Sequence, residues 1–342
     1  MNIGFSTSVF FNNIGNAFID YGAEYQVRQV IPGDAQLIKL SQCANFAASL
    51  STQFAIKELP GIEWLWTRVM QRFVNQLHDK TYKAVSTLDV LSPAKIAKLD
   101  YLVIPGCVLT VPFFVIFGKF LEEKIAQGCK IVFLGASGNY YTEEERKCVR
   151  EWLLKIKPHA ILFRDSKAYK YYHDCTEMSY NGIDNVWFVN RLEVAKCSTI
   201  YDPYAVLNFD LPKNKGIKKE LAKSLTEKGM KIIETDHKPF PYSKVGKLAR
   251  RNVVCSDFPY DYLFLYKNVR ETYTDRVHAC IPSLAFGNKA QIFSDSPRIS
   301  LFENVNIDIT ELKSHPMSID LAALRQLQDK QIEFLRGIFN SK

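Results

Sequence analysis

The fold is decided by residues 101–138, YLVIPGCVLTVPFFVIFGKFLEEKIAQGCKIVFLGASG. Residues 101–104 are apolar and rich in branched side chains, which predicts a buried strand. A helix over 112–127 follows, closed by Gly128 as its C-cap residue, and then a second strand over 130–134. This order of strand, helix and strand is typical of an α/β protein whose strands run parallel.

The same alternation extends along the rest of the chain. Thr142 and Glu145 form a capping box, which predicts the start of another helix. Further predicted helices lie at 64–82, 217–228, 259–267, 276–286 and 321–339, and further predicted strands at 160–163, 186–189, 205–209, 231–234, 252–255, 272–273 and 290–293. The length of 342 residues favours two domains of ~100–200 residues each. We place the domains at 1–170 and 171–315, and a terminal helix at 316–342.

Composition narrows the class of partner. The chain is 47% hydrophobic and 23% charged, which suits a large core, and its net charge is +8. This charge suits nucleic acid, an anionic membrane surface or a phosphorylated substrate, although solvated loops would also explain it. The basic residues gather at 213–219 and 244–251. No nucleic-acid-binding motif is recognised, so we expect no nucleic acid as a partner.

Several absences set the expected location and cofactors. No stretch reaches the ~18 uninterrupted apolar residues of a membrane helix, and the N-terminus lacks the basic region of a signal peptide. We therefore expect a cytoplasmic protein. The eight cysteines form no C-x-x-C pair, and neither a G-x-G-x-x-G nor a Walker A sequence is present. We expect no metal and no cofactor.

Small and polar residues at predicted turns are the first candidates for a site, because ligands of parallel sheets bind beyond the carboxyl ends of the strands. Asn13, Gly15 and Asn16 open a predicted helix, whose free N–H groups favour an anion or a sugar phosphate. An ordinary N-cap is the alternative. Ser137 and Gly138 form either a tight turn or a small-residue floor where substrate approaches backbone amides.

Arginines occupy three further turns. Arg164 follows a predicted strand, where it would bind a carboxylate or phosphate, or else form an internal pair with Asp165 or a neighbouring acid. The most informative turn is TDRVH at 274–278, since Arg276 offers a cation beside His278, which titrates near neutral pH. Ser296 and Arg298 add a hydroxyl and a cation, unless they form a solvated loop.

These segments, in this order, resemble the polysaccharide pyruvyl transferases. That family carries an N-x-G-[DN] segment, a mid-chain arginine turn and a late [ST]-x-R-x-H turn, followed by G-x-x-x, a strand and S-x-R. The corresponding segments here are NIGN at 13–16, FRDS at 163–166, TDRVH at 274–278, GNKA at 287–290 and SPR at 296–298. The chain departs from the family at Asn16, where many relatives have Asp, and at 105–107, which lacks a glycine-rich run. Both departures bear on contacts with the acceptor.

The resemblance implies a fold and a reaction. The fold would consist of two facing Rossmann-like domains, similar to the GT-B glycosyltransferase arrangement, with the acceptor bound by 1–170 and the donor by 171–315. The reaction would move pyruvate from phosphoenolpyruvate onto hydroxyls of a glycan as a ketal, in polysaccharide biosynthesis. An acceptor linked to a membrane lipid would let the basic segments rest on anionic headgroups at the inner face of the membrane.

The resemblance also implies roles for the candidate residues. Arg276 and Arg164 would hold the anionic groups of the donor and stabilise charge as phosphate leaves. His278 would be the general acid and base. The remaining substrate-binding candidates are Thr274, Arg298, Ser296, Asn13, Gly15, Asn16, Ser137 and Gly138.

Two other functions stay open from the residues alone. A nucleotide-sugar-dependent glycosyltransferase would share the fold, and fold does not settle function. It would need contacts to a base and a ribose, which no segment of the sequence identifies. A non-catalytic glycan- or anion-binding protein would keep binding without turnover, but the presence of both Arg276 and His278 argues against it.

Overall fold

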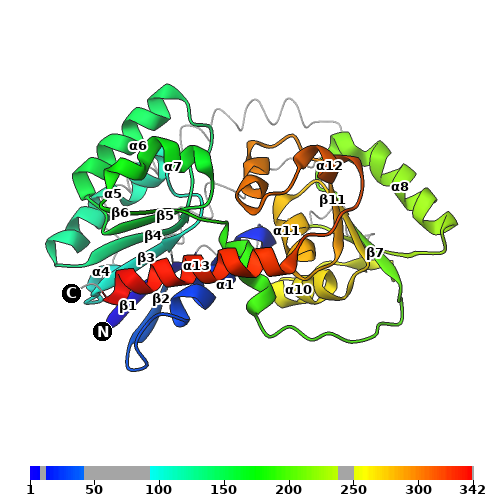
Figure 1. Ribbon diagram of the computed structural model, residues 1–342, viewed down its shortest axis with the longest axis horizontal. Coiled ribbons are helices and arrows are strands. Elements are labelled where there is room, and N and C mark those ends of the chain that lie inside the picture. The colour runs from blue at the N-terminus through cyan, green and yellow to red at the C-terminus, as the bar shows by residue number, and fades with distance from the viewer. Residues whose placement is uncertain (8–12, 42–92, 238–249, 341–342) are drawn as a thin grey trace, which may run out of the picture. The chain divides into compact units, whose positions relative to one another are not determined.

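The computed structural model describes residues 1–7, 13–41, 93–237 and 250–340, with the side chain of Ile116 left out (Figure 1). The helix predicted at 64–82, with its Trp64, Trp66 and Phe73, lies outside the described residues. Most of the basic segment 244–251 does so as well.

The chain divides into two compact units, each built from separate stretches of sequence. Unit 1 comprises Met1–Ser8, Pro32–Leu162 and Tyr171–Ser179, and unit 2 comprises Val9–Ile31, Phe163–Lys170 and Tyr180–Lys342. Unit 2 therefore includes one segment from near the N-terminus and one from the middle of the chain. Both segments carry candidate site residues.

Unit 1 is built on a six-stranded sheet with the order β2-β1-β3-β4-β5-β6. Its strands are β1 (Asn2–Thr7), β2 (Gln36–Ser41), β3 (Tyr101–Pro105), β4 (Lys130–Ala136), β5 (Ala160–Phe163) and β6 (Met178–Asn181). The helices among its described residues are α4 (Pro93–Ile96), α5 (Val111–Ala126) and α6 (Glu143–Ile156), while α7 (Ser166–Tyr172) and the 3-10 turn η1 (His173–Cys175) connect β5 to β6. β3 pairs in parallel with both β1 and β4, so the predicted strand–helix–strand order is confirmed.

The core of unit 1 explains why this stretch folds as predicted. Every residue of β3 is buried, and the Phe114 ring of α5 stacks on the Trp152 ring of α6, with centroids 5.9 Å apart. Burial of such side chains stabilises the fold by roughly 25 cal/mol per Å² of apolar surface. α5 ends at Ala126, and the chain turns away at Gly128, whose φ of +86° is a left-handed conformation that glycine adopts without strain. Thr142 caps α6 by accepting a hydrogen bond from Glu145 N, as predicted.

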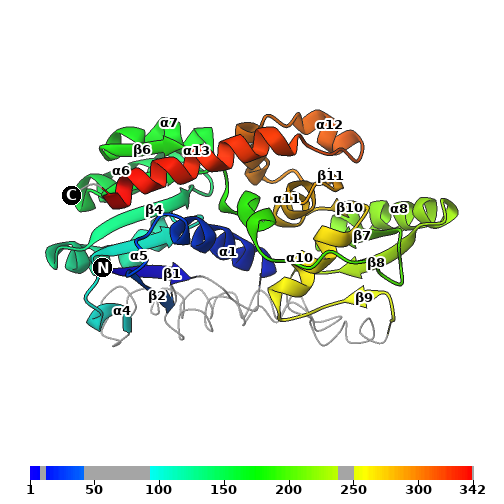
Figure 2. The same ribbon diagram turned by 60° about the horizontal axis from the view of Figure 1, so that its bottom comes forward.

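Unit 2 is built on a five-stranded sheet with the order β11-β10-β7-β8-β9, and each adjacent pair is parallel (Figure 2). Its strands are β7 (Tyr204–Asn208), β8 (Lys231–Thr235), β9 (Val253–Val254), β10 (Glu271–Thr274) and β11 (Lys289–Ile292). The α-helices that the structure describes in this unit are α1 (Ile14–Arg28), α8 (Lys215–Glu227), α10 (Pro259–Asn268), α11 (Val277–Ala285), α12 (Ile309–Ser314) and α13 (Leu321–Asn340). Its 3-10 helices are η2 (Asn185–Arg191), η3 (Pro212–Asn214) and η5 (Pro297–Val305).

One predicted strand of unit 2 is wrong. Residues 186–189 belong to η2, because the Asp184 carboxylate accepts a hydrogen bond from Val186 N and caps a helix there. A short apolar run does not by itself distinguish a buried strand from a buried helical turn. The helix is held against α1 so closely that a Cβ on Gly22 would lie 1.8 Å from Asn185 O.

Candidate functional site

The site of unit 2 begins at the point where the strand order reverses. β7 lies between β8 and β10, so the chain leaves the centre of the sheet in opposite directions, and such a switch point is where parallel sheets bind ligands. The carboxyl ends of these strands are tied by Asn208, which accepts from Thr274 Oγ1 (3.0 Å) and donates to Thr235 O (3.2 Å). The turns that follow β7 and β10 therefore start from a fixed floor.

The turn after β10 is shaped by two of its own residues. Thr274 is fully buried, and its hydroxyl accepts from Arg276 N at 2.9 Å. The Asp275 carboxylate accepts from the backbone amides of Asp210 and Leu211, at 3.0 and 2.9 Å, and from Asn214 Nδ2 at 3.0 Å. These bonds leave the next two side chains of interest, Arg276 and His278, at the start of α11.

Arg276 is only partly satisfied by the protein. Its Nε donates to the Asp210 carboxylate at 2.6 Å, whereas its Nη2 is buried and has no hydrogen-bond partner among the described residues. The amide N–H groups of Val277 and His278 also lack an acceptor in the described part of the chain, as expected at a helix start. A guanidinium donor and the positive end of a helix dipole thus lie together, which is an arrangement that binds anions.

His278 lies one residue inside α11 and is buried. Its Nε2 faces Asp184 Oδ2 at 3.8 Å and makes no hydrogen bond to the described residues. Burial lowers the pKa of His278 from its usual value, against the pull of the Asp184 carboxylate, and the charges of Arg164 and Arg298 lower it further. The imidazole is therefore neutral at pH 7 and able to accept a proton.

Asp184 joins Arg164 to His278. The Arg164 Nη1 donates to Asp184 Oδ2 at 2.8 Å, and both side chains are buried. Burial alone would raise the pKa of Asp184, but the charge of Arg164 and the neighbouring His278 hold it well below its usual range. Removing one partner of such a buried pair costs about 3–5 kcal/mol. Arg164 thus forms the internal pair that was one of its two sequence interpretations, with Asp184 in place of Asp165.

The N-terminal motif meets the histidine within unit 2. A Cβ on Gly15 would lie 2.9 Å from His278 Cβ and 3.2 Å from its Nδ1, so any larger residue would press on the imidazole. Asn13 caps α1 by accepting from Gly15 N (3.1 Å), and its Nδ2 donates to Asn16 Oδ1 (3.2 Å). Segments 13–16 and 274–278 are far apart in sequence and form one site.

The expectation of free amides at the start of α1 is wrong for three groups. Ile14 N donates to His237 O (3.0 Å), Gly15 N to the Asn13 side chain and Asn16 N to Asn13 O (3.1 Å). Acceptors within the protein thus bind the three backbone N–H groups that we expected to be available for an anion. The sequence could not show this, because His237 lies more than 200 positions along the chain.

His237 is a further residue that sequence reasoning missed. It is fully buried at the end of β8, and its Nε2 lies 2.6 Å from the Tyr266 hydroxyl. Burial lowers its pKa to about 3, and the charges of Arg276 and His278 contribute. It follows a strand at the switch-point edge, but nothing local in the sequence marks it as different from the other histidines.

The turn after β4 in unit 1 is filled by the protein itself. Gly138 N donates to the Tyr141 hydroxyl at 2.9 Å. The Glu145 carboxylate accepts from the amides of Tyr140 and Tyr141, at 2.9 and 2.5 Å, and more distantly from Asn139 N (3.4 Å). Ser137 is buried. Of the two interpretations of this turn, these bonds fit the tight turn, because a carboxylate and a hydroxyl of the same chain accept from its amides.

The last two candidates lie at the start of η5. Ser296 accepts from Arg298 N at 3.3 Å and so caps this helix. The Arg298 side chain is exposed, and its charge is close enough to His278 to lower the pKa of the imidazole. Ser137 and Gly138 belong to unit 1, whereas the other candidates all belong to unit 2: Arg164, Arg276, His278, Asn13, Gly15, Asn16, Thr274, Ser296 and Arg298.

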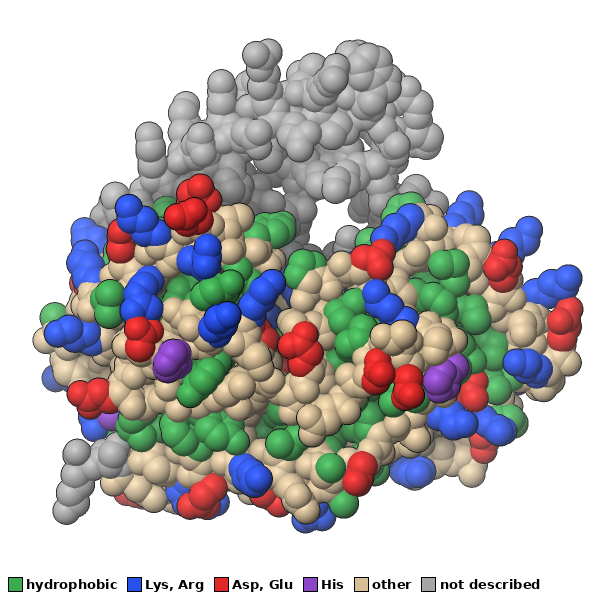
Figure 3. All heavy atoms as spheres, turned by 45° about the horizontal axis from the view of Figure 1, so that its top comes forward, with side chains coloured by type: hydrophobic (Ala, Val, Ile, Leu, Met, Phe, Trp, Pro, Cys, Tyr) green, Lys and Arg blue, Asp and Glu red, His purple; other side chains and the backbone are tan. Residues whose placement is uncertain are grey.

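The basic segment 213–219 is partly neutralised. Lys213 pairs with Asp295 at 2.9 Å and Lys218 with Glu234 at 2.6 Å, and Arg250 also contacts Glu234. On the face drawn in Figure 3, Lys and Arg side chains are interspersed with Asp and Glu. None of the described helices is long and apolar enough to cross a membrane.

The family of the chain is decided by a comparison with family models. The model described as polysaccharide pyruvyl transferase matches residues 13–289, which include both the Asn13 turn and the α11 turn. The chain belongs to the polysaccharide pyruvyl transferase family. A search of curated proteins gave no match in sequence.

Solved structures show the same fold at low sequence identity. MnaA of S. aureus, determined with UDP, superposes with a TM-score of 0.53 and 12% identity over 99% of this chain and 90% of that one. A putative UDP-N-acetylglucosamine 2-epimerase from Listeria monocytogenes gives 0.52 and 9% over 97% and 90%. UDP-GlcNAc 2-epimerase from Neisseria meningitidis gives 0.52 and 9% over 99% and 93%. The expected α/β fold of the GT-B type is confirmed.

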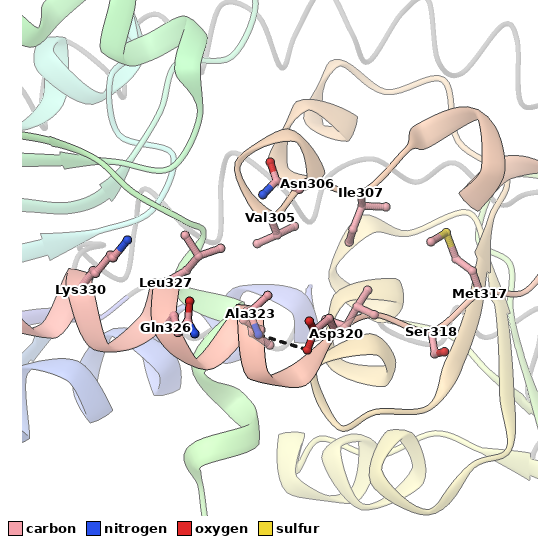
Figure 4. A pocket seen from close by; sticks show the side chains of 12 residues that line it. Val305, Asn306, Ile307, Met317, Ser318, Asp320, Ala323, Gln326, Leu327 and Lys330 are labelled. Carbon is pink, nitrogen blue, oxygen red and sulfur yellow. Dashed lines mark hydrogen bonds between the residues drawn. The ribbon is translucent and has the colours of Figure 1, made fainter.

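A groove of about 420 Å³ lies elsewhere in unit 2, between α13 and the segments around η5 and α12 (Figure 4). Val305, Ile307 and Leu327 contribute apolar walls, and Asp320 and Lys330 lie near its ends. None of the sequence-predicted site residues lines it.

Among the described residues, no group of three His, Cys, Asp or Glu side chains is placed to hold a metal ion.

Proposed function

We propose that this protein transfers pyruvate from phosphoenolpyruvate to two hydroxyls of a glycan, forming a ketal and releasing phosphate. The observation that carries the proposal is the start of α11, where the buried Arg276 Nη2 and two helix amides have no partner among the described residues. They lie beside a buried neutral histidine in a chain that belongs to the pyruvyl transferase family.

The chemistry of the donor fits these groups. Phosphoenolpyruvate carries a carboxylate and a phosphate, and both are acceptors for a guanidinium and for helix N–H groups. Arg276 would bind one of these anions with the nitrogen that Asp210 leaves unpaired. Arg298, exposed at the start of η5, would add a second cation. Arg164 would act on the donor through Asp184 and His278, because its Nη1 already binds the carboxylate.

His278 would move the protons of the reaction. The Nε2 facing Asp184 favours the tautomer that carries its proton there, so Nδ1 is the basic nitrogen. One sugar hydroxyl adds to C2 of the donor and passes its proton to Nδ1, while the methylene carbon takes up a proton from water and becomes a methyl group. His278 then returns its proton to the departing phosphate, and the second hydroxyl closes the ketal at C2 and gives its own proton back to water. Gly15 has no side chain to press on Nδ1, from which a Cβ would lie 3.2 Å away.

Calorimetric titration with phosphoenolpyruvate tests the donor assignment. We expect Arg276→Lys to weaken binding by about 10–100-fold, because a lysine ammonium cannot reach the Asp210 carboxylate and the donor with separate nitrogens of one planar group, as Nε and Nη2 of Arg276 would. The matched control is Arg270→Lys. Arg270 is exposed and directly precedes β10, the strand that leads to the Arg276 turn. Equal affinity in wild type and Arg276→Lys would remove Arg276 from the donor site. Binding of UDP-N-acetylglucosamine and not of phosphoenolpyruvate would make the protein a nucleotide-sugar enzyme.

A further inference from the structure

The segment that carries Asp184 is held by the C-terminal helix. Gln331 of α13 accepts from Ile183 N at 2.8 Å, and its Nε2 donates to Gln26 Oε1 of α1 at 2.8 Å. Gln26 in turn donates to Asn185 Oδ1 at 2.9 Å. The residues on both sides of Asp184 are therefore tied to α13, either directly or through α1, which lies against α13 (Figures 1 and 2).

The orientation of these amides is fixed by the backbone. Ile183 N can only donate, so it requires the oxygen of Gln331 and turns the Gln331 nitrogen toward Gln26. Gln26 must then offer its oxygen to Gln331, and its nitrogen is left for Gly22 O (3.1 Å) and Asn185. Because Gln331, Gln26 and Asn185 are all buried, any other register would leave polar atoms unsatisfied at about 1–3 kcal/mol each.

A second anchor holds the far end of the same segment. Gln328, fully buried and one turn before Gln331, donates to Trp187 O at 2.6 Å and to Asn190 Oδ1 at 2.8 Å. Its oxygen accepts from Arg191 Nε at 2.7 Å. Apolar packing would allow η2 to slide along α13, whereas these directional bonds permit one position.

We propose that α13 is a positioning element of the active site. Through Gln331 and Gln328 it fixes the segment 183–191, and so places the Asp184 carboxylate where it meets both Arg164 and His278. The helix lies outside residues 13–289, which the family model matches. The importance of this placement for catalysis rests on the proposed function, but the placement itself can be tested without substrate.

The test is the titration of the His278 ring, followed by NMR in protein labelled at histidine and assigned by loss of the signal in His278→Ala. The charged and titratable groups that face the ring are Asp184, Arg164, Arg298 and His237. In Gln331→Leu the carboxylate loses its anchor, so we expect the pKa of His278 to fall further and pyruvyl transfer to fall about 10–100-fold. Gln326→Leu, an exposed glutamine on the same helix, should leave both unchanged.

Asp184→Asn decides whether the effect passes through the carboxylate. It should lower the pKa of His278 as Gln331→Leu does, and combining the two changes should add nothing further. A folded Gln331→Leu whose His278 titrates as in wild type would overturn the proposal. If Gln331→Leu does not fold, Gln331→Asn replaces it. This variant keeps the amide, but its side chain is too short to reach both Ile183 and Gln26. An unchanged titration of His278 in Gln331→Asn would also overturn the proposal. If the wild-type protein does not transfer pyruvate, the proposed function is contradicted. The titration of His278 in the variants would still test the placement of Asp184 by α13.

Discussion

Two turns of the molecule have the same local plan and opposite chemistry. Each follows a buried parallel strand and leads into a helix: residues 137–142 lie between β4 and α6, and residues 275–276 lie between β10 and α11. In the first turn, Glu145 and Tyr141 of the same chain satisfy the backbone amides. In the second, Arg276 Nη2 and His278 Nε2 are buried without hydrogen-bond partners among the described residues.

The difference identifies a turn at which buried polar side-chain atoms lower the stability of the fold. Buried polar atoms are nearly always hydrogen-bonded in native proteins, because each unsatisfied group costs about 1–3 kcal/mol. We call residues 137–142 the closed turn and residues 275–276 the open turn. The closed turn follows that rule, whereas two neighbouring side chains at the open turn, Arg276 and His278, depart from it. Such a departure is expected at a site that a ligand completes.

The largest expected effect is the loss of the histidine in the open turn. We expect His278→Ala to reduce pyruvyl transfer by about 10²–10⁴-fold, the usual contribution of a general acid and base. His315→Ala is the control, because His315 is an exposed histidine of the same unit. The rate of phosphate release from phosphoenolpyruvate with a glycan acceptor measures both variants. Near-wild-type turnover in His278→Ala would contradict the role given to this turn.

A smaller effect, on stability, is expected from His237, whose pKa is lowered by burial and by the charges of Arg276 and His278. Its folded pKa of about 3 is below the unfolded value of 6.5, so the unfolded state binds the extra proton between these values. Stability is therefore complete above pH 6.5 and falls as the pH drops toward 3, by about 1.4 kcal/mol per pH unit within this window. Between pH 7 and pH 5 His237 should contribute a loss of about 2 kcal/mol.

Urea unfolding at pH 7 and pH 5 isolates this contribution. His237→Gln keeps a polar partner for Tyr266 and has no proton to bind. The stability difference between wild type and this variant should therefore narrow by about 2 kcal/mol at the lower pH. His315→Gln should show a constant difference from wild type. A constant difference for His237→Gln would mean that His237 is charged in the folded protein.

The smallest effect is expected from opening the closed turn. Glu145→Ala removes the acceptor of the turn amides and should destabilise the protein by about 1–3 kcal/mol. Glu144→Ala, an exposed neighbour in the same first turn of α6, should be nearly neutral. Affinity for phosphoenolpyruvate, measured by calorimetry, should change less than twofold in both. A large loss of affinity in Glu145→Ala alone would place the donor at the closed turn.

The sequence predicted those features of the fold that depend on neighbouring residues. The strand–helix–strand order of 101–138, the left-handed Gly128 and the Thr142 cap are local, and all are confirmed. The run at 186–189 was predicted wrongly because its conformation is set by the Asp184 cap and by burial against α1.

The site was predictable only in part, for the same reason. Arg276 and His278 stand two positions apart, so their proximity is visible in the sequence. Asp184 meets His278 from 94 positions away and Arg164 from 20. The carbonyl of His237 takes a helix amide more than 200 positions distant. A local sequence pattern does not predict contacts between residues so far apart. These contacts determine which hydrogen-bond donors of the site lack a partner within the described residues.

The central claim is that the donor binds at the open turn of unit 2. A crystal structure of the protein with phosphoenolpyruvate tests it most directly. We predict density for the donor against Arg276 Nη2 and the amides of Val277 and His278, with C2 within reach of His278. Density at the turn 137–141, or a donor held without Arg276, would contradict the account.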